Sequence, residues 1–499
     1  MAQRQIQRGV AFSLPLHAQI YERFKALIAE GQMRPGQRVP SLRGLADEMG
    51  VARGTVETAY DRLIGEGYLV ARGPSGCYVA EKISIQPPGT AEPTRGAVLP
   101  QTSALNLRPV PEPSPLTPGL PALDAFPRKL WARLVAREAR APHALQRPPV
   151  VGHAPLRRAL ASYLYRARGI ACQADQIFIV PGYGAGLTRL VDALLRPGDK
   201  AWVETPGFPP TRLVLGQLGL TTVPVPVDAD GIDVEAGRRA SLRARLAVVT
   251  PAHQSPLGVS MSLARRAALL RWAHEQQSWI LEDDYDGEYR YFGRPLPALK
   301  SLDQSDRVIY AGTFSKVLFP GLRLAYLVVP TSQIPAFEAS AFRDLNGGCP
   351  ALMQAVVSEF IEQGHFARHI RRMRALYAKR RGYLVNALAA HTRNGLRVDL
   401  HEGGMHLIIG WEEQLHDDTV LAERARAVGF AVPALSPWGA GGKGSQGLLL
   451  SFTNVVTQEQ AIRLVGRLLR ALNQTGIEQR SAVDHHVRAR TAQAGDRSR

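Results

Sequence analysis

Apolar residues recur at helical spacing three times within the first eighty residues of the chain. The pattern predicts short helices over 15–31, 41–49 and 53–66. Pro35-Gly36 and Gly50 separate these helices, and Ser41 is a suitable N-cap for the second. The stretch YLVARGPSGCYVA (68–80) then alternates like two short strands around a glycine-rich turn. Three helices followed by a hairpin, with a tight Gly-containing turn between the second and third helices, predict a winged helix-turn-helix module.

A different pattern begins near residue 122, where short β-branched runs alternate with amphipathic helical stretches. Strands are predicted at 176–180, 200–204, 246–250, 278–283, 308–312 and 324–329, with helices at 186–195 and 263–276 among them. This alternation predicts an α/β fold with a mainly parallel sheet covered by helices on both faces. Ligands bind such sheets beyond the carboxyl ends of the strands, so the residues that follow each strand are the candidates for a site.

Composition divides the chain into four parts. Residues 87–121 are dense in proline, which is typical of an extended, semi-rigid spacer. From about residue 479 the sequence is polar and rich in arginine. We therefore predict a DNA-binding-type module at 12–82, a linker at 83–121, a large domain at 122–478 and a disordered basic tail at 479–499.

The charge of the chain narrows the class of partner. Its 499 residues are 45% hydrophobic and 21% charged, which excludes a wholly disordered or fibrous protein. The formal net charge is +18 and the isoelectric point is about 10.2, a balance that attracts polyanions such as DNA, RNA or an anionic membrane. The alternative is a basic protein without such a partner. No apolar run is long enough to span a membrane, no secretory signal is visible, and three widely spaced cysteines form no disulfide or zinc pattern. We expect a cytoplasmic protein.

The third predicted helix begins with Arg53, Gly54 and Thr55, and recognition helices present their N-terminal residues to base edges in the major groove. Arg38, Arg43 and Arg72 are expected to meet phosphates or a groove edge. Ser41 and Gly76 are further candidate DNA-binding residues. The core should contain Leu45, Val56, Tyr60 and Leu63. The module resembles the GntR family of bacterial winged helix-turn-helix repressors over its whole length, which implies a double-stranded DNA operator. The alternative is a small helical domain that binds another protein.

Three strand ends in the large domain carry residues that suit a phosphorylated aldehyde cofactor. The turn PGYGAG (181–186) follows the first strand, and its small residues let backbone N–H groups and a helix dipole hold a phosphate. Asp283 follows another strand, and Lys316, flanked by hydroxyl residues, follows a third with Arg323 shortly beyond. A lysine amine can form the Schiff base, hydroxyls and a guanidinium can bind the phosphate, and an Asp can keep a pyridine nitrogen protonated. Taken singly, each residue has an ordinary surface or loop interpretation.

The body of the chain looks like the fold-type I aminotransferase-like domain, which binds pyridoxal 5′-phosphate. Over about residues 12–475 the whole resembles the MocR/GabR subfamily of GntR regulators. The carrying motifs are ETPGF (204–208), TPAHQSPLG (250–258), LEDDYDGEYRY (281–291), AGTFSKVLFPGLRLAYL (311–327) and HIRRMRALYAKRR (369–381). The resemblance implies that Lys316 forms the internal aldimine, that Asp283 pairs with the pyridine nitrogen and that Tyr285 bonds the phenolic oxygen. It further implies a ring stacked on Phe208, a phosphate held near Gly182, Tyr183, Gly184, Thr313, Ser315 and Arg323, and a position near the cofactor for His253. A loop-capping role is the alternative for that histidine.

Two departures from the family pattern bear on the ligand. PGYGAG replaces the usual Gly-(Ser/Thr)-Gln-Gln turn, and Leu449 stands where the family usually has an arginine. Aminotransferases use that arginine to clamp a substrate carboxylate, which leucine cannot do. Lys443, Arg290 and Arg294 are possible substitutes, although each is also consistent with a solvated surface charge.

We therefore predict a transcriptional regulator that senses a small molecule through pyridoxal phosphate on Lys316, without being an enzyme. The effector would be an amine, a sulfonate amine or pyridoxal phosphate itself, and the resemblance implies a head-to-tail homodimer. The basic stretch 369–381 could add phosphate contacts or be a solvated face. The main alternative is an aminotransferase with an appended DNA-binding domain, and a further one is a large domain that has lost its cofactor.

Overall fold

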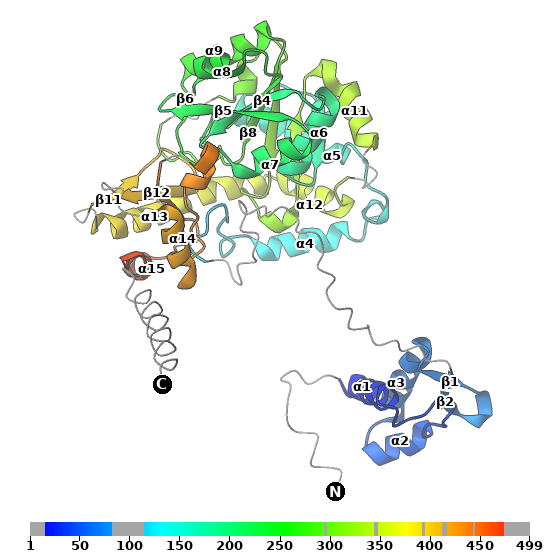
Figure 1. Ribbon diagram of the computed structural model, residues 1–499. Helices are drawn as coiled ribbons and strands as arrows, with labels where there is room; N and C mark the ends of the chain where they lie inside the picture. Colours follow the sequence, from blue (N-terminus) through cyan, green and yellow to red (C-terminus); the bar gives the residue numbers. More distant parts are fainter. Residues whose placement is uncertain are drawn as a thin grey trace, which may run out of the picture. The chain divides into compact units, whose positions relative to one another are not determined.

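The computed structural model describes residues 15–81, 114–293, 297–343, 348–391, 395–411, 417–442 and 445–473. The chain forms two compact units, one within residues 1–101 and the other within 102–499 (Figure 1). Most of the predicted linker at 83–121 and the whole predicted tail at 479–499 lie outside the described residues. Within the described part, no helix is long and apolar enough to cross a lipid bilayer.

The N-terminal unit is a winged helix-turn-helix, as the sequence predicts. Helices α1 (Leu16–Ala29) and α2 (Leu42–Met49) both pack against α3 (Arg53–Gly65). Ser41 Oγ accepts a hydrogen bond from the Gly44 N–H and so caps α2. Gly50 ends the same helix in the left-handed conformation, at φ 66°. The side chains predicted for the core are all buried, namely Leu45, Val56, Tyr60 and Leu63.

The wing is built by three segments. Strands β1 (Leu69–Ala71) and β2 (Cys77–Val79) pair in antiparallel fashion. The segment before α2 joins them, because the Val39 N–H donates to the Cys77 carbonyl and the Val79 N–H donates to the Gln37 carbonyl, at 2.9 and 2.8 Å. This pairing brings the side chain of Arg38, between Gln37 and Val39, to the wing.

The large unit contains an eight-stranded sheet that is mainly parallel, as predicted. The order across the sheet is β3 (Ile177–Val180), β10 (Ala325–Val328), β9 (Val308–Thr313), β8 (Trp279–Asp284), β7 (Leu246–Val249), β4 (Lys200–Thr205), β5 (Thr221–Asp228) and β6 (Gly231–Ile232). Strands β10 and β6 run antiparallel to their neighbours, and the others are parallel to one another. The six strands predicted from sequence are confirmed within one residue at each end.

Strand β5 was missed by the sequence analysis, because Pro224 and Pro226 interrupt it. Both prolines pair with β4, whereas β6 pairs only with the last two residues of β5. Most of β5 is therefore an edge strand, and proline is tolerated in a sheet where its missing N–H faces no partner strand.

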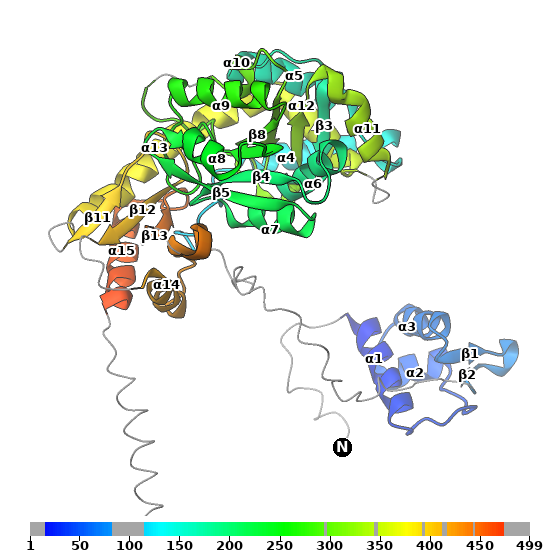
Figure 2. The ribbon, with the colours of Figure 1, turned by 45° about the horizontal axis from the view of Figure 1, so that its top comes forward.

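Helices cover both faces of the sheet (Figures 1 and 2). They are α4 (Arg128–Glu138), α5 (Ala154–Arg168), α6 (Tyr183–Leu194), α7 (Pro209–Gln217), α8 (Val234–Ser241), α9 (Leu263–Glu275), α10 (Leu299–Leu302), α11 (Ile334–Arg343), α12 (Ala351–Glu362) and α13 (His365–Ala389). One face, with α6, α7 and α11, buries a cluster that includes Phe178, Leu281 and Phe337. The opposite face buries Trp202 and Trp272, whose ring centroids lie 3.9 Å apart.

A smaller antiparallel sheet follows α13. It consists of β11 (Leu396–Asp399), β12 (His406–Trp411) and β13 (Leu448–Ser451), in that order, with α14 (Asp418–Ala427) and α15 (Gln458–Asn473) beside it. The register places Leu449 of β13 opposite Ile408 of β12. Helix α13 packs on α15 and so joins this part to the main sheet.

The described residues that precede α4 belong with the large unit, although the sequence boundary at 121 places them in the linker. Leu116 is fully buried in the main core, and its carbonyl accepts a hydrogen bond from the Ser451 N–H at 2.9 Å. The Leu120 carbonyl accepts from Thr453 Oγ1 at 2.5 Å. Residues 114–121 therefore lie between β13 and the carboxyl end of the main sheet, where they reach the candidate site.

Candidate functional site

The carboxyl ends of β3 and β9 bring together a cradle suited to a phosphate. Gly182 precedes α6 with φ 118°, a conformation open to glycine alone, and a β-carbon there would lie 3.2 Å from Arg323 Nη2. Arg323 itself adopts a left-handed conformation at φ 51°. Thr313 Oγ1 accepts a hydrogen bond from the Ser315 N–H at 3.1 Å. Gly182, Arg323 and the two hydroxyl residues thus lie beside the N-terminus of α6, which favours anions.

Lys316 is half-buried at this end of the sheet. Its Nζ donates to the Gly119 carbonyl at 3.0 Å. Burial lowers the pKa of Lys316, and the nearby carboxylates of Asp286 and Asp283 oppose that shift. A lowered pKa increases the neutral, nucleophilic fraction of the amine, which is what Schiff-base formation requires.

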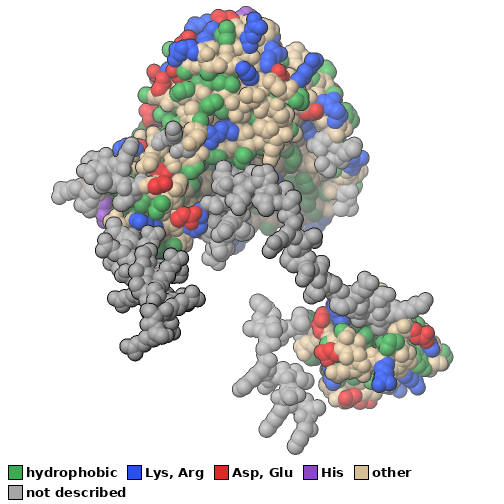
Figure 3. Space-filling view, in the orientation of Figure 1, with side chains coloured by type: hydrophobic (Ala, Val, Ile, Leu, Met, Phe, Trp, Pro, Cys, Tyr) green, Lys and Arg blue, Asp and Glu red, His purple; other side chains and the backbone are tan. Residues whose placement is uncertain are grey.

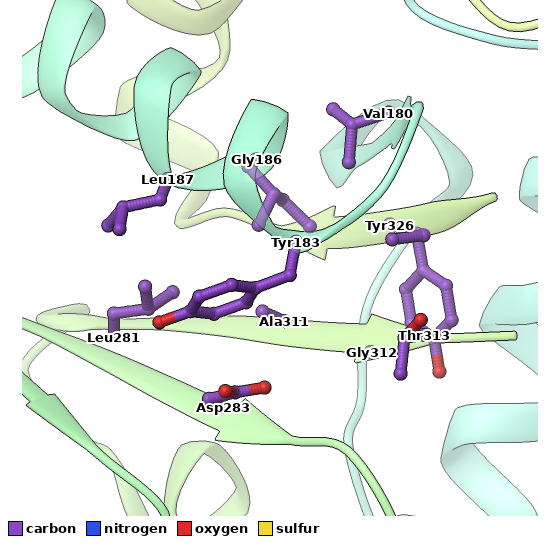
Figure 4. A pocket seen from close by; sticks show the side chains of 12 residues that line it. Val180, Tyr183, Gly186, Leu187, Leu281, Asp283, Ala311, Gly312, Thr313 and Tyr326 are labelled. Atoms are coloured by element: carbon purple, nitrogen blue, oxygen red, sulfur yellow. The ribbon is translucent and has the colours of Figure 1, made fainter. Parts of the chain in front are cut away.

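Asp283 ends β8 on the site side of the sheet. Burial raises its pKa well above the ordinary value, and the neighbouring Asp284 adds to that shift. Figure 4 shows Tyr183, from the first turn of α6, extending its ring over the sheet with the hydroxyl directed to the region of Asp283 and Leu281. Thr211 meets that hydroxyl at 2.9 Å. A cation on a ligand, such as a protonated ring nitrogen, would stabilise the Asp283 carboxylate.

The adjacent Asp284 points into the protein and has a structural role. It forms a buried ion pair with Arg168, accepts a hydrogen bond from Tyr310 Oη at 2.7 Å and accepts another from the Gly287 N–H at 3.1 Å. Successive residues of a strand face opposite sides. The two neighbouring aspartates are therefore assigned to different tasks by their place in β8.

Tyr285 and His253 meet directly beside this strand. Tyr285 Oη lies 2.9 Å from His253 Nδ1, and Asp286 Oδ2 lies 3.2 Å from the same nitrogen. The imidazole is only 5% exposed and the carboxylate only 1%. Sequence analysis did not select Asp286, although its place directly after Tyr285 was a usable signal. His253 therefore contacts Tyr285, a second residue of the candidate site.

Aromatic side chains stand at the outer side of the site. Phe208, the residue before α7, is 38% exposed. Its ring centroid lies 6.1 Å from that of Tyr183 and 6.0 Å from that of Trp438. The Gly207 N–H donates to the Trp438 carbonyl at 3.0 Å. Trp438 was not selected from sequence, because it comes from a distant segment that only the fold brings to Phe208.

The position of the missing arginine clamp is apolar. Leu449 is buried with Ile408 and Leu435, and Leu257 and Trp438 pack against this cluster. Of the three proposed substitutes, Arg290 forms an ion pair with Glu402. Arg294 and Lys443 lie outside the described residues. Among the described residues, the surroundings of Leu449 are thus built for packing and not for a carboxylate.

The predicted DNA-contacting residues gather at the start of α3 and at the wing. Arg53 and Gly54 are exposed on the first turn of α3, where Thr55 is half-buried, and Arg43 is exposed on α2. Ser41 Oγ is already engaged as the cap of α2. At the wing, a β-carbon on Gly76 would lie 3.3 Å from Arg38 Nε. Arg72 pairs with Glu81 at 2.9 Å and lies over the Tyr78 ring.

The basic charge of the large unit is dispersed on the face that Figure 3 shows, where Lys and Arg side chains alternate with acidic ones. The predicted basic stretch 369–381 falls within α13, and several of its side chains point inward. His369 and Arg380 are buried, and Arg380 pairs with Asp124 at 2.5 Å. Much of this stretch therefore stabilises the fold.

The side chains gathered at this edge of the sheet are of the kinds that pyridoxal phosphate requires. Gly182 and Arg323 form a cradle that a single β-carbon would fill. Lys316 is a half-buried amine that donates its hydrogen bond to a carbonyl, and Asp283 is a half-buried carboxyl at the same edge of the sheet. Among the described residues there is no cluster of His, Cys, Asp and Glu suited to a metal ion.

Comparison with known proteins agrees with both units. Residues 16–79 match the model of bacterial regulatory proteins of the gntR family, and residues 123–465 match that of aminotransferase class I and II. The chain is 37% identical over 478 residues to the probable rhizopine catabolism regulatory protein MocR of Rhizobium meliloti, covering 93% of this chain and 95% of that one. It is 34% identical to the pyridoxine biosynthesis transcriptional regulator PdxR of Corynebacterium glutamicum, covering 87% and 91%. Kynurenine aminotransferase of Pyrococcus horikoshii has a similar structure, with a TM-score of 0.64 and 29% identity over 72% of this chain and 90% of that one.

The fold and the site define a DNA-binding regulator in which a winged helix-turn-helix is joined to an aminotransferase-like domain. More particularly, the chain belongs to the GntR-family transcriptional regulators of the MocR subfamily.

Proposed function

We propose that this regulator binds pyridoxal 5′-phosphate and uses it to sense a small molecule, and that it does so without sustained turnover. The observation that carries the proposal is the half-buried amine of Lys316, with its lowered pKa, at one edge of the sheet with Asp283 and the Gly182–Arg323 cradle. Bound there, the cofactor would supply an electrophilic carbon that amines can attack. The relatives named as regulators support regulation over turnover.

Each residue would hold one part of the cofactor. Arg323 and the α6 N-terminus at Gly182, Tyr183 and Gly184 would bind the phosphate, with Thr313 and Ser315 nearby. Asp283 would accept a hydrogen bond from the protonated ring nitrogen, and Tyr285 would donate a hydrogen bond to the phenolic oxygen. Phe208 would cover the outer face of the ring, where its partial exposure leaves it room to do so.

The effector would be an amine whose recognition does not depend on an α-carboxylate. Buried Leu449 and its apolar neighbours support this class, because they offer no cation to a carboxylate. A sulfonate amine belongs to the same set of candidates. Pyridoxal phosphate itself is the second candidate effector, favoured by the relative named as a regulator of pyridoxine biosynthesis.

On DNA, the start of α3 would read bases while Arg38, Arg43 and Arg72 meet phosphates. The exposure of Arg53 and Gly54 on α3 supports this role. We also propose the head-to-tail homodimer that the subfamily resemblance implies, since two modules would read two half-sites. Effector binding must then favour one arrangement of the units over another by a few kcal/mol.

The deciding experiment is the visible absorption spectrum of the full-length protein with added pyridoxal phosphate, beside Lys316→Ala. A band in the parent that is absent from the variant supports the cofactor and its lysine. A parent without a band overturns the proposal, and the large domain would then sense a ligand by other means. Sustained transfer of an amino group from any amine donor to a keto-acid acceptor would instead favour the alternative function, an aminotransferase with an appended DNA-binding domain. The structural likeness to aminotransferases supports that alternative.

A further inference from the structure

A buried carboxylate beside the site lacks a hydrogen bond. Both oxygens of Asp286 are buried, and neither has a hydrogen-bond partner among the described residues. Among the described residues, the basic group within 4 Å of this carboxylate is the His253 ring, with Nδ1 at 3.2 Å from Oδ2. The Lys316 amine also faces Asp286, but it donates its hydrogen bond to the Gly119 carbonyl. A buried carboxylate left in this condition is costly unless a neighbouring group presents a proton to it.

The imidazole of His253 is held in one place. Glycines flank it on two sides, because a β-carbon on Gly404 would overlap the ring and one on Gly258 would lie 3.0 Å from Nε2. Both glycines have positive φ, at 83° and 72°, so the backbone itself is shaped around the ring. His253 therefore meets Tyr285 Oη and Asp286 Oδ2 through a fixed Nδ1, while its buried Nε2 has no partner among the described residues.

These contacts settle where the neutral ring keeps its hydrogen. An ionised Asp286 can only accept, so a lone pair on Nδ1 facing it at 3.2 Å would be repelled, whereas an N–H there is attracted. A hydrogen on Nε2 would be a buried donor without a partner. The hydrogen therefore belongs on Nδ1, and the Tyr285 oxygen at 2.9 Å accepts it.

We propose that Asp286 and His253 are positioning residues that act through Tyr285. Asp286 keeps the His253 hydrogen on Nδ1, His253 donates it to the Tyr285 oxygen, and Tyr285 is left to donate its own hydrogen to an acceptor on the ligand. This inference rests on the proposed function, because the acceptor would be the phenolic oxygen of pyridoxal phosphate. A hydroxyl group donates a stronger hydrogen bond when its own oxygen accepts one, so the bond from His253 would strengthen the one that Tyr285 donates.

The other ionisable groups around this chain leave the arrangement intact. Desolvation of the half-buried Tyr285 raises its pKa. Asp286, Asp283 and Glu204 add to the rise, and the Ser255 hydroxyl opposes it. Two further imidazoles face His253, and burial lowers the pKa of His401 to about 4 and that of His406 to about 3. Both are neutral at pH 7, and His406 Nε2 is already bonded to the Pro256 carbonyl at 2.9 Å.

The first arm of the test needs no cofactor. Protein labelled with ¹⁵N-histidine reports which ring nitrogen carries the hydrogen, and His253→Leu identifies the His253 signals by their loss. We expect a protonated Nδ1 in the parent and a shift of the hydrogen toward Nε2 in Asp286→Asn. A parent hydrogen on Nε2, or an Asp286→Asn spectrum identical to the parent's, would overturn the inference.

The second arm uses the cofactor-loaded full-length protein and follows the pH midpoint of its visible band. A hydrogen bond to the phenolic oxygen stabilises its deprotonated form, so His253→Leu should raise the midpoint by about one pH unit. His253→Asn, which can keep a donor near the Nδ1 position, should reverse most of the shift. His401→Leu is the control for loss of a neighbouring imidazole.

Tyr285 is the link that this arm must establish. In a Tyr285→Phe background, His253→Leu should cause no further shift, since the two act on the same hydrogen bond. Additive shifts in the double variant would overturn the inference. The absence of a visible band in the parent would count against the proposed function alone, because the histidine spectra are recorded without cofactor.

Discussion

Lys316 donates its hydrogen bond to the backbone carbonyl of Gly119 at 3.0 Å. Gly119 belongs to the short segment that leads from the proline-rich stretch into α4. The carbonyl of the next residue, Leu120, accepts a hydrogen bond from Thr453 Oγ1. Any ligand that engages the Lys316 amine must release this bond. If pyridoxal phosphate binds as proposed, the segment nearest to the linker would therefore be the first part of the large unit to change its contacts.

Substitution of Gly119 should disturb the lysine more than the fold. Gly119 has φ 75°, and a β-carbon there would overlap Lys316 Nζ. In Gly119→Ala we expect weaker pyridoxal phosphate binding, measured by titration of the visible band, together with a backbone cost of about 1–2 kcal/mol. Gly395→Ala is the control, since Gly395 has the same φ of 75° with open space around it. Equal effects of the two variants on cofactor affinity would contradict the role of the Lys316–Gly119 contact.

Gly182 tests the phosphate cradle. A methyl group there would meet Arg323 Nη2 at 3.2 Å and push the guanidinium away from the space that an anion would occupy. Gly182→Ala should lower the affinity for pyridoxal phosphate by roughly 10- to 100-fold, the equivalent of one charge-assisted hydrogen bond. Gly198→Ala places a similar strain, at φ 92°, in a turn with no atom nearby and should leave the affinity unchanged. A cradle that serves another purpose would show no difference between these variants.

Gly54 separates DNA contact from stability. Gly54 and Gly65 both lie in α3, and a β-carbon on either would meet no protein atom within 4 Å. Alanine should therefore not lower the thermal midpoint of the unit in either variant. If the start of α3 enters the major groove, Gly54→Ala should weaken binding to DNA selected from a random pool by roughly tenfold, about 1.4 kcal/mol, while Gly65→Ala binds normally. Normal binding by both would place the reading surface elsewhere.

Local patterns were sufficient to predict the sheet and the winged module. The apolar runs of β3, β7 and β9 are buried throughout, so a continuous apolar stretch identified each of them. Strand β5 was not predicted, because its two prolines argue against a strand unless its position at the edge of the sheet is known. Propensity is local, whereas the place of a strand in a sheet is not.

In the candidate site, too, local motifs predicted some residues and missed those whose contacts depend on the fold. Motif spacing selected Lys316 and Asp283, which the fold brings to one edge of the sheet. It could not select Gly119 or Trp438, because their contacts come from segments far away in sequence. The different tasks of Asp284 and Asp286 also depend on what packs against each, namely Arg168 in one case and His253 in the other. Such partners become visible only once the chain is folded.

Glu204 should make the large unit less stable as the pH rises. Burial raises its pKa from 4.5 to about 7, against the hydrogen bonds from Thr250 and Gln254. The folded state thus holds a proton that the unfolded state releases, so the contribution of this group is complete below pH 4.5 and is lost as the pH rises through 7. Between these limits the loss is about 3 kcal/mol.

The measurement is chemical denaturation of the parent and of Glu204→Gln at several pH values. The stability of the parent relative to Glu204→Gln should fall across this window, because the variant cannot titrate. Glu235→Gln removes a carboxylate that is 70% exposed and should follow the parent. A parent and a Glu204→Gln variant with parallel pH profiles would show that Glu204 has an ordinary pKa.

The apolar surroundings of Leu449 predict how this site ranks its ligands. A bidentate arginine clamp favours an α-amino acid over the matching amine without the carboxylate by roughly 10- to 100-fold, since a charge-assisted hydrogen bond contributes about 1.5–3 kcal/mol. Leu449, buried against Ile408 and Leu435, provides no such contact.

We expect matched pairs of an amino acid and its decarboxylated amine to perturb the visible band at similar concentrations, or the amine to do so at the lower concentration. Leu449→Met, which conserves volume, is the control for packing and should leave that ranking unchanged. A strong preference of the parent for the amino acids would mean that a cation outside the described residues takes the place of the arginine, and Lys443→Ala and Arg294→Ala would then show which one.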